Sequence, residues 1–348
     1  MAAKVTAFAA SFAIAGRAVG GGAPCYVIAE AGVSHFGSLE KARALVDLAA
    51  DAGADAVKFQ HYTAERLVGP AAPEWRERLR GREMPDEAML QIADYCRRRG
   101  ITFLCTAHDE PALEFLARTA DVPAFKIGSG EVENWPFVAN VARRGKPVIL
   151  STGMYTLDQI RAALKVLREN GCCEAAVLHC VTSYPADPAT INLDAIRQIR
   201  EFFEGPVGYS DHTTGTAVAL AAVALGADIL EKHITLDFNV PDAQDWKVAC
   251  GPNDFAGFVA DVRAVAAARG GTPRHLADNE RQSLQWARKS LTAARDIAVG
   301  ETIEADMLLS QRPGNGLPPS RLSDVLGRRT RRAIAAGTMI ALDMIENG

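Results

Sequence analysis

Eight short apolar runs, separated by segments with helical periodicity, set the pattern of residues 25–270. The runs are YVIAEAG (26–32), AVKFQ (56–60), TFLCTA (102–107), AFKIGSG (124–130), PVILSTG (147–153), AAVLHCV (175–181), VGYSDHT (207–213) and ILEKHITL (229–236). Between them lie amphipathic segments such as LEKARALVDLAADAG and LDQIRAALKVLRENG, whose glycines stand where a helix should end. Short apolar strands that alternate with amphipathic helices are typical of a parallel sheet covered by helices.

These eight strand–helix units predict a closed (β/α)₈ barrel, the TIM barrel, because residues 25–270 match the size of that α/β fold. An open doubly wound sheet is the alternative architecture. It would usually gather its polar site residues at one switch point, whereas every run here ends in polar residues. The pattern therefore favours the barrel.

The two ends of the chain depart from the barrel pattern. Residues 1–24 include KVTAFAASFAIAG, which has a faint likeness to a signal peptide, but Gly20–Gly22 lead directly into the first strand. We therefore expect a short β-hairpin extension there. Residues 271–286 are polar and rich in turn formers and predict a linker. Residues 287–348 carry short β-like pieces and predict a small β-rich second domain, which we expect to dock on the barrel or on a partner subunit.

The composition of the 348 residues, 48% hydrophobic and 23% charged, is that of an ordinary globular enzyme. A formal net charge of −4 argues against a general attraction to nucleic acid or to an anionic membrane. No apolar run approaches the roughly 20 residues that span a bilayer. The seven cysteines are an odd number without a CxxC pair, so we expect reduced thiols and a cytoplasmic protein with neither nucleic acid nor membrane as a partner.

Polar side chains stand at the end of every predicted strand, and in a barrel these ends meet at one mouth. In chain order they are Glu30, Lys58, Gln60, Thr106, Lys126, Ser129, Glu131, Ser151, Thr152, Thr182, Tyr184, Ser210, His212, Glu231, Lys232 and His233. Each residue taken alone is more often an ordinary loop residue. Together, the lysines and hydroxyls suit the binding of a phosphate or a carboxylate in a partly dry pocket.

His212 and His233 close the last two predicted strands, which are neighbours in a barrel. Two neutral imidazoles, with room for water and substrate oxygens, would hold a labile divalent ion with open positions. The alternative is that each is a hydrogen-bonded core histidine.

Seven of these motifs resemble, in the same order, the N-acetylneuraminate (sialic acid) synthase family, which includes legionaminate and pseudaminate synthases. They are YVIAEAGVSHFGS, DAVKFQ, FKIGSGE, PVILSTGM, HCVTSYP, VGYSDHT and LGADILEKHITL. The resemblance runs from about residue 24 to 345. RKSLTAARDIAVGETI and RPGNGLPP in the tail resemble the antifreeze-like (SAF) domain of these enzymes.

The resemblance implies a transferase that joins phosphoenolpyruvate to an open-chain aldose, expected to be an acetamido sugar. The products are a 2-keto-3-deoxy sugar acid and phosphate, released by C–O cleavage. His212 and His233 would hold the metal, with Mn²⁺ as the first choice and Mg²⁺ or Co²⁺ as alternatives. Glu30 would position water or transfer a proton. Phosphoenolpyruvate would be held by Lys58, Thr106, Lys126, Ser129, Ser151, Thr182 and Ser210.

On the sugar side, the resemblance implies contacts from Gln60, Glu131, Tyr184, Asp245 and Arg312. Arg312 lies in QRPGNGL and matches an arginine that family members contribute from the SAF domain of the partner subunit. The active site would then be completed across a domain-swapped homodimer. Considered without the family, Arg312 is an exposed loop arginine.

The chain departs from the family pattern at positions that cluster on the presumed sugar side. Ser34 and Phe36 replace the usual asparagines, His61-Tyr62 replaces Thr-Phe, and His108 replaces the common phenylalanine. The stretch from Asp245 through Trp246 to Cys250 is one residue longer than expected. These changes predict the same reaction on an unusual aldose. The alternatives are another aldose or aldose-phosphate synthase that uses phosphoenolpyruvate, a metal-dependent barrel hydrolase, and a non-catalytic sugar-binding barrel.

Overall fold

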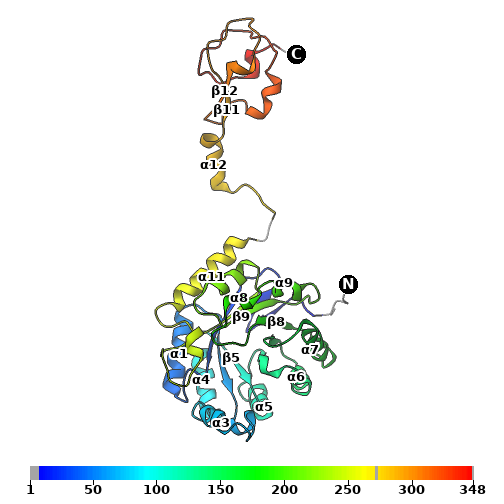
Figure 1. The fold of residues 1–348 in the computed structure, drawn as a ribbon, viewed down its shortest axis with the longest axis vertical. Coiled ribbons are helices and arrows are strands. Elements are labelled where there is room, and N and C mark those ends of the chain that lie inside the picture. The colour runs from blue at the N-terminus through cyan, green and yellow to red at the C-terminus, as the bar shows by residue number, and fades with distance from the viewer. Residues whose placement is uncertain (1–7, 271–272, 347–348) are drawn as a thin grey trace. The chain divides into compact units, whose positions relative to one another are not determined.

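The computed structural model describes residues 8–270 and 273–346, which fall into two compact units, 1–271 and 272–348 (Figure 1). In the first unit, eight parallel strands close into a barrel in the order β10-β3-β4-β5-β6-β7-β8-β9. They are β3 (Tyr26–Gly32), β4 (Ala56–His61), β5 (Thr102–Ala107), β6 (Phe125–Ile127), β7 (Val148–Ser151), β8 (Ala175–Cys180), β9 (Val207–Asp211) and β10 (Ile229–His233). The predicted (β/α)₈ barrel is confirmed.

Most strands end earlier than the apolar runs that predicted them. The run over 124–130 is a strand only over Phe125–Ile127, because Ser129–Glu131 form a short 3-10 turn, η1. The run over 229–236 is a strand only to His233. The polar residues beyond these ends therefore belong to the loops at the barrel mouth, where a site can form.

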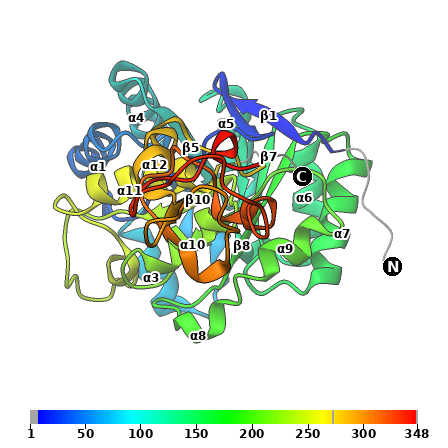
Figure 2. The ribbon, with the colours of Figure 1, turned by 90° about the horizontal axis from the view of Figure 1, so that it is seen from above.

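The helices of the first unit lie around the outside of the strands (Figure 2). They are α1 (Leu39–Asp51), α2 (Ala64–Leu67), α3 (Pro73–Arg80), α4 (Asp86–Arg99), α5 (Glu110–Arg118), α6 (Trp135–Ala142), α7 (Leu157–Glu169), α8 (Pro188–Ile191), α9 (Ala195–Arg200), α10 (Ala217–Ala224) and α11 (Phe255–Arg269). A 3-10 turn, η2 (Asp245–Val248), precedes α11. Within residues 8–270 and 273–346, no helix is both long and apolar enough to cross a membrane.

Local sequence signals set the helix ends. The Ser38 side chain accepts from the backbone N–H of Lys41 at the start of α1. Thr156 and Gln159 form a reciprocal capping box at the start of α7. Gly100 ends α4 with a φ of 69°, a left-handed conformation that glycine adopts without steric cost.

An antiparallel hairpin, β1 (Ser11–Ile14) and β2 (Arg17–Gly20), packs against one end of the barrel. Phe12, Ile14 and Val19 join a buried cluster with residues from the first half of the strands, among them Ile28 and Leu104. The hairpin therefore closes the end of the barrel opposite the strand ends that carry the polar residues. Residues 1–7 of the expected extension lie outside the described residues.

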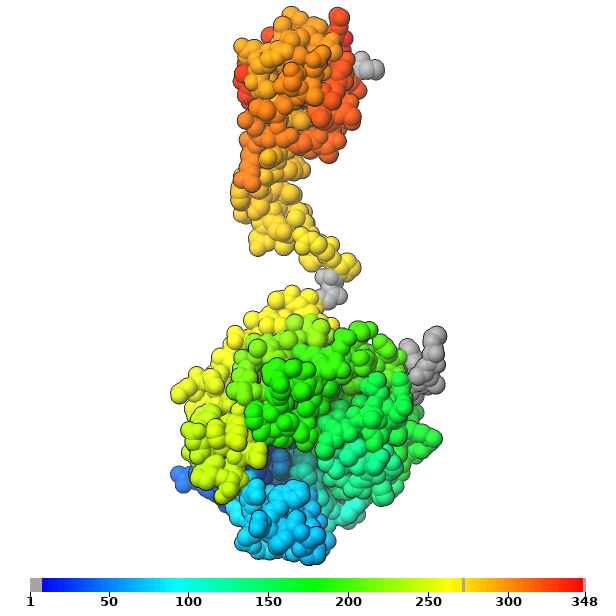
Figure 3. All heavy atoms as spheres, viewed as in Figure 1, coloured from blue at the N-terminus to red at the C-terminus, as the bar shows by residue number. Residues whose placement is uncertain are grey.

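The second unit has its own packed core and fills a compact volume (Figure 3). Its regular elements are α12 (Asp278–Ala287), the antiparallel strands β11 (Ser290–Ala293) and β12 (Leu308–Gln311), and the 3-10 turns η3 (Ala305–Met307), η4 (Pro319–Asp324) and η5 (Leu342–Met344). Part of the segment expected to be a linker is thus helical. The C-terminal end of α12 is tied to this unit, because the Gly314 N–H donates to the Gln285 carbonyl at 2.8 Å.

A buried ion pair joins the ends of β9 and β10 on their outer faces. Lys232 Nζ donates to Asp211 Oδ2 at 2.7 Å and to the Thr213 carbonyl at 2.8 Å. Asp211 Oδ1 accepts from the Thr213 hydroxyl and N–H and from the Tyr209 hydroxyl. Both charges are fully paired away from water, as a buried ion pair requires. The pair therefore fixes the backbone on either side of His212.

Replacing Lys232 by methionine should leave the Asp211 carboxylate buried without its counter-charge. We expect the free energy of unfolding to fall by about 3–5 kcal/mol, as for other buried pairs that lose one partner. Urea unfolding followed by circular dichroism measures this. Lys165→Met on the exposed face of α7, where Lys165 pairs with Glu169, is the matched control and should cost less than about 1 kcal/mol. An equally small effect of both variants would show that the buried pair does not stabilise the barrel.

Candidate active site

A cavity of about 340 Å³ opens at the carboxyl ends of the strands, and all eight strands or the loops directly after them contribute to it. It is lined by Glu30, Lys58, Gln60, Trp75, Thr106, His108, Lys126, Gly128, Ser129, Ser151, Cys180, Thr182, Tyr184, Ser210, His212, Glu231 and His233. Of the residues to which the family resemblance gave a role, all but Glu131, Asp245 and Arg312 line this cavity. The structure thus brings the predicted lysines, hydroxyls and histidines together.

The strand register explains this convergence. Side chains alternate between the two faces of a strand, so residues two apart on one strand face the same way. In the barrel, Glu30 pairs with Lys58 on one side and with His233 on the other. Gln60 pairs with Thr106, and Ser210 pairs with Glu231. Inward-facing residues from neighbouring strands therefore lie side by side around the mouth.

Two buried lysines and two buried glutamates form the charged centre of the cavity. Lys58 Nζ lies 2.7 Å from Glu30 Oε2 and 3.7 Å from Glu231 Oε2. Lys126 Nζ lies 3.5 Å from Glu231 Oε1. Neutral donors and acceptors complete the cluster: Lys58 donates to Thr106, Lys126 to Ser151, Gln60 to Glu30 and Ser210 to Glu231. With both pairs ionised, the cluster carries no net charge.

Burial and mutual attraction act against each other on these four groups. Burial alone would raise the pKa of Glu231, but the ammonium groups of Lys126 and Lys58 hold it below its ordinary value. Burial alone would lower the pKa of Lys58, but Glu231 and Glu30 raise it. Burial prevails at the other two groups, lowering the pKa of Lys126 and raising that of Glu30. Glu231 is therefore the principal counter-ion, and Glu30 is the carboxyl that more readily takes up a proton.

Hydroxyl groups and the backbone of Gly153 pack closely together near the cavity that Lys126 lines, and we call this cluster the anion cradle. The Gly153 N–H donates to Ser129 Oγ at 2.9 Å. A Cβ on Gly153 would collide with the hydroxyls of Thr182 and Ser129, so only glycine lets this backbone come so close. Hydroxyls, a backbone N–H and an ammonium group gathered in this way suit a phosphate or a carboxylate.

His212 and His233 face each other with ring centroids 5.4 Å apart. His212 Nδ1 lies 2.8 Å from the Val181 carbonyl, so it carries the proton and leaves a lone pair on Nε2, to which the Tyr184 hydroxyl donates at 2.9 Å. Burial lowers the pKa of His233, and among the described residues nothing hydrogen-bonds its buried Nδ1. Both rings can therefore offer a nitrogen as a metal ligand.

A divalent ion fits this donor set only as a loosely held ion. Throughout the described part of the chain, no group of three or more His, Cys, Asp or Glu side chains is arranged to hold a metal. Two imidazoles would supply two ligands, and the other positions would be filled by water or substrate oxygens. Such a site suits a catalytic ion better than a structural one.

Three predicted sugar contacts lie outside the cavity. Glu131 sits in η1, where it accepts from Asn134 at 2.6 Å. Asp245 in η2 lines a smaller neighbouring cavity with Ser34, Phe36 and Trp246, and its charge acts on His233. Arg312 belongs to the second unit, where its Nε donates to the Ala287 carbonyl at 2.9 Å. Their roles remain predictions.

The sequence reasoning assigned no role to Glu231, Gly153 or Trp75. Glu231 had a signal, because it stands two residues before His233 on the same strand and therefore faces the same way. Gly153 stood in the STG motif without any sign of how closely the neighbouring hydroxyls approach. Trp75 had no signal, since it lies on α3 in the long connection between β4 and α4.

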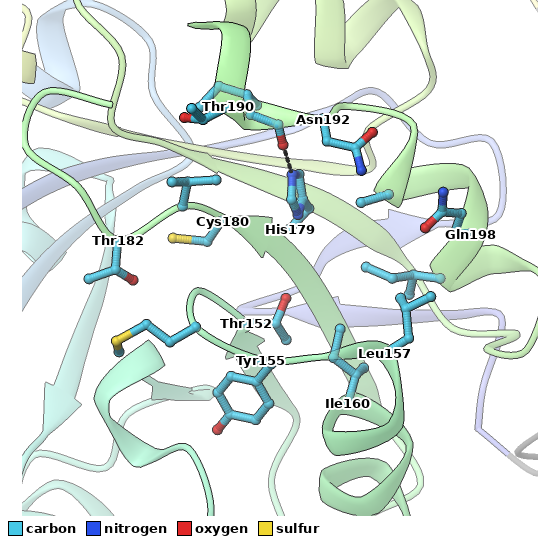
Figure 4. A pocket seen from close by; sticks show the side chains of 15 residues that line it. Thr152, Tyr155, Leu157, Ile160, His179, Cys180, Thr182, Thr190, Asn192 and Gln198 are labelled. Atoms are coloured by element: carbon cyan, nitrogen blue, oxygen red, sulfur yellow. Dashed lines mark hydrogen bonds between the residues drawn. The ribbon is translucent and has the colours of Figure 1, made fainter. Parts of the chain in front are cut away.

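A second cavity, of about 490 Å³, lies beside the first, between the loop after β7, the end of β8 and helices α8 and α9 (Figure 4). Its walls combine apolar side chains such as Leu157 and Ile160 with polar ones such as Asn192 and Gln198. His179 is held there by a hydrogen bond to the Ile191 carbonyl, drawn as a dashed line. Cys180 and Thr182 line both cavities, so the loop after β8 connects them.

The chain is similar to known proteins along nearly its whole length. A model of the NeuB family matches residues 45–274, and a model of the SAF domain matches residues 288–346. The chain is 35% identical over 339 residues to the N,N'-diacetyllegionaminic acid synthase of Legionella pneumophila, covering 92% of this chain and 95% of that protein. It is 33% identical over 352 residues to the human N-acetylneuraminate-9-phosphate synthase, covering 95% and 96%. The solved N-acetylneuraminic acid synthetase of Leptospira borgpetersenii, in complex with citrate, superposes with a TM-score of 0.74 at 32% identity, covering 79% of this chain and 95% of that one.

Lys126→Met tests the anion cradle. Losing one charged hydrogen-bond donor should weaken the binding of inorganic phosphate about 10- to 100-fold, measured by isothermal titration calorimetry. The variant should still fold, because Glu231 keeps Lys58 as a counter-ion and Ser210 as a hydrogen-bond donor after Lys126 is lost. Lys165→Met makes the same change on exposed α7 and should bind phosphate like the unmodified chain. Unchanged affinity in Lys126→Met would place the anion elsewhere.

Proposed function

This chain belongs to the NeuB family of sugar-acid synthases, and on that premise we propose that it condenses phosphoenolpyruvate with an open-chain acetamido aldose. The products are a 2-keto-3-deoxy sugar acid of the nonulosonic type and inorganic phosphate. The observation that carries the proposal is one cavity in which two lysines and a ring of hydroxyls stand beside the imidazoles of His212 and His233. The lysines and hydroxyls suit the anionic substrate, and the imidazoles suit the carbonyl substrate.

The proposed anion subsite holds phosphoenolpyruvate through charge and hydrogen bonds. Lys58 and Lys126 neutralise its phosphate and carboxylate, while Thr106, Ser129, Ser151, Thr182 and Ser210 donate hydroxyls. Glu231 forms ion pairs with both lysines and so holds them in position. Positioning of this kind turns binding energy into alignment of the reacting carbon atoms. Because the lysines are buried, their attraction for the developing phosphate charge is stronger than it would be in water.

The proposed reaction forms one carbon–carbon bond and breaks one carbon–oxygen bond. C3 of phosphoenolpyruvate attacks the aldehyde carbon, whose oxygen takes a proton. Water adds to the electron-poor C2 and loses its proton. The bond between C2 and the bridging oxygen then breaks and its electron pair leaves with phosphate. The hydroxyl on C2 loses its proton in the same step and becomes the ketone oxygen. Glu30 is proposed to position this water or accept its proton, since Gln60 and Lys58 fix its carboxyl and burial raises its pKa.

His212 and His233 are proposed to hold a divalent ion, Mn²⁺ in the first place and Mg²⁺ or Co²⁺ as alternatives. When bound, such an ion supplies a Lewis acid for the aldehyde oxygen. The chain's own contribution is to orient the ring of His212 and to keep that of His233 neutral. The Val181 carbonyl fixes the ring of His212, and burial keeps His233 unprotonated.

Acceptor binding is proposed to involve Gln60 and Tyr184 in the cavity, with Glu131 and Asp245 near its rim. Arg312 is proposed to come from the SAF domain of a partner subunit in a domain-swapped homodimer. The proposed setting is the cytoplasm, which the seven free thiols support.

The reaction is tested with phosphoenolpyruvate that carries ¹⁸O in the bridging position, offered with a panel of 2-acetamido hexoses. We expect phosphate release with at least one aldose, and mass spectrometry should find the ¹⁸O in phosphate and the condensed acid among the products. EDTA should abolish release, and added Mn²⁺ should restore it.

Each arm of that experiment can fail separately. Release of phosphate without ¹⁸O would mean P–O cleavage and a different reaction. Release that EDTA does not affect would remove the metal role from His212 and His233. No release with any aldose or aldose phosphate would favour a sugar-binding barrel without turnover.

Domain exchange is tested by complementation between Arg312→Ala and Lys126→Met. We expect each variant alone to be inactive. In mixed dimers, the intact barrel of one chain would meet the intact Arg312 of the other, so co-expression should restore about a quarter of the normal activity. An active Arg312→Ala variant would exclude its role, and no restoration would exclude the exchange.

A further inference from the structure

Tyr62 contacts both His108 and the helix that carries Trp75, on the β4–β5 side of the candidate active site. His108 and Trp75 both line the cavity. Tyr62 packs edge-on against His108, with ring centroids 6.1 Å apart and an interplanar angle of 71°. Two of these three residues are positions at which the chain departs from the family pattern. These two departures, Tyr62 and His108, are therefore in contact with each other, and His108 is the one that lines the cavity.

His108 brings a neutral hydrogen-bonding atom to the cavity. It follows β5 directly, and its backbone N–H donates to the His61 carbonyl at 3.1 Å. Its Nε2 is buried, and nothing in the described parts of the chain hydrogen-bonds it. Burial, helped by the positive charges of Lys58 and Lys126, lowers the pKa of His108 to about 4, so the ring is neutral at pH 7.

A buried polar atom without a partner is costly, and such atoms in folded proteins call for an explanation. His108 lines a cavity, so a bound molecule can supply the missing hydrogen bond once the ring turns Nε2 toward it. The neutral ring gives it little attraction for an anion. The two lysines nearby already provide for phosphate and carboxylate. A hydroxyl or an amide group is therefore the fitting partner for Nε2.

Trp75 adds an aromatic face at the rim of the same cavity. None of the side chains of α3, all of which the structure describes, is buried, and Trp75 is 54% exposed. Polar contacts hold the helix in place instead. The Tyr62 hydroxyl donates to the Leu79 carbonyl at 3.2 Å, and Arg76 Nε donates to the Val68 carbonyl at 2.8 Å. The indole is thus presented to the cavity and left for a ligand to cover.

We propose that His108 and Trp75 select the aldose, with Nε2 of His108 hydrogen-bonded to a hydroxyl or amide of the acceptor and the indole of Trp75 covering its apolar face. Tyr62 is a positioning residue, because it touches both the His108 ring and the helix that carries Trp75. This inference rests on the proposed condensation. It adds that the accepted aldose carries a polar substituent that faces position 108. The phenylalanine that is common in the family at this position could not form a hydrogen bond with that substituent.

The test is His108→Phe, assayed by phosphate release with the aldose that the unmodified chain uses best and with its singly deoxygenated and deaminated analogues. We expect the variant to lose about 10- to 100-fold in kcat/KM with the parent aldose, and to change little with the one analogue that lacks the group facing Nε2. The KM for phosphoenolpyruvate should stay the same. His108→Gln, which keeps a hydrogen-bonding group, should recover part of the discrimination.

Trp75 and Tyr62 have their own measurements. Trp75→Ala should raise the KM for the aldose about 10-fold or more while leaving the KM for phosphoenolpyruvate unchanged. Tyr62→Phe should raise the aldose KM by a smaller factor, through the lost bond to α3. Tyr95→Phe is the matched control, because it removes the same hydroxyl from a contact with Asp47 between α1 and α4. It should not change either KM.

The outcomes separate this inference from the proposed reaction. If the unmodified chain condenses an aldose but His108→Phe discriminates among the analogues as before, the inference is wrong and the reaction stands. If no aldose reacts, the inference is tested by measuring whether aldoses bind. Tryptophan emission is then titrated with the 2-acetamido hexoses in the presence of inorganic phosphate. A change that Trp75→Phe abolishes and His108→Phe weakens supports the inference, and no change with any aldose overturns it.

Discussion

Two ammonium groups and two carboxylates are buried together at the centre of the barrel mouth, and the rest of the site is arranged around them. Buried charges persist only when they are paired and hydrogen-bonded. Lys58 and Lys126 meet this condition by sharing Glu231, while Glu30 takes the other side of Lys58. The cluster is neutral before any ligand enters. An arriving anion therefore finds lysines already held in position and competes only with carboxylates that are themselves anchored.

Because side chains alternate along β9 and β10, neighbouring residues face opposite sides of the barrel wall and have different roles. His212 and His233 face the cavity, while Asp211 and Lys232 face the surrounding helices and lock the same strand ends from behind. A rigid backbone on the outer face is what holds two imidazoles in position on the inner face. The Asp211–Lys232 ion pair and the two imidazoles can therefore occupy adjacent positions in the chain, because they lie on opposite faces of the strands.

The cavity also separates parts with different chemistry. The strand ends carry the lysines, hydroxyls and imidazoles, whose proposed roles are the same for every acceptor sugar. The long connection between β4 and α4 and the residues after β5 carry Trp75 and His108, which touch the cavity from its rim. Barrel enzymes commonly vary their loops over a constant strand framework. Substrate choice in this chain is accordingly expected to reside in the rim.

The sequence by itself determined the barrel, because eight short apolar runs, spaced by helical segments, leave few other ways to bury that surface. It also placed most of the site, since the ends of parallel strands must meet at one mouth. The close approach of Gly153 to two hydroxyls, the sharing of Glu231 by two lysines and the arrival of Trp75 from α3 were decided only by the tertiary structure. So were the positions of Glu131 and Asp245 outside the cavity and the helical part of the expected linker. Local pattern fixes which way a strand residue points, whereas loop paths and charge pairing depend on contacts between segments far apart in the chain.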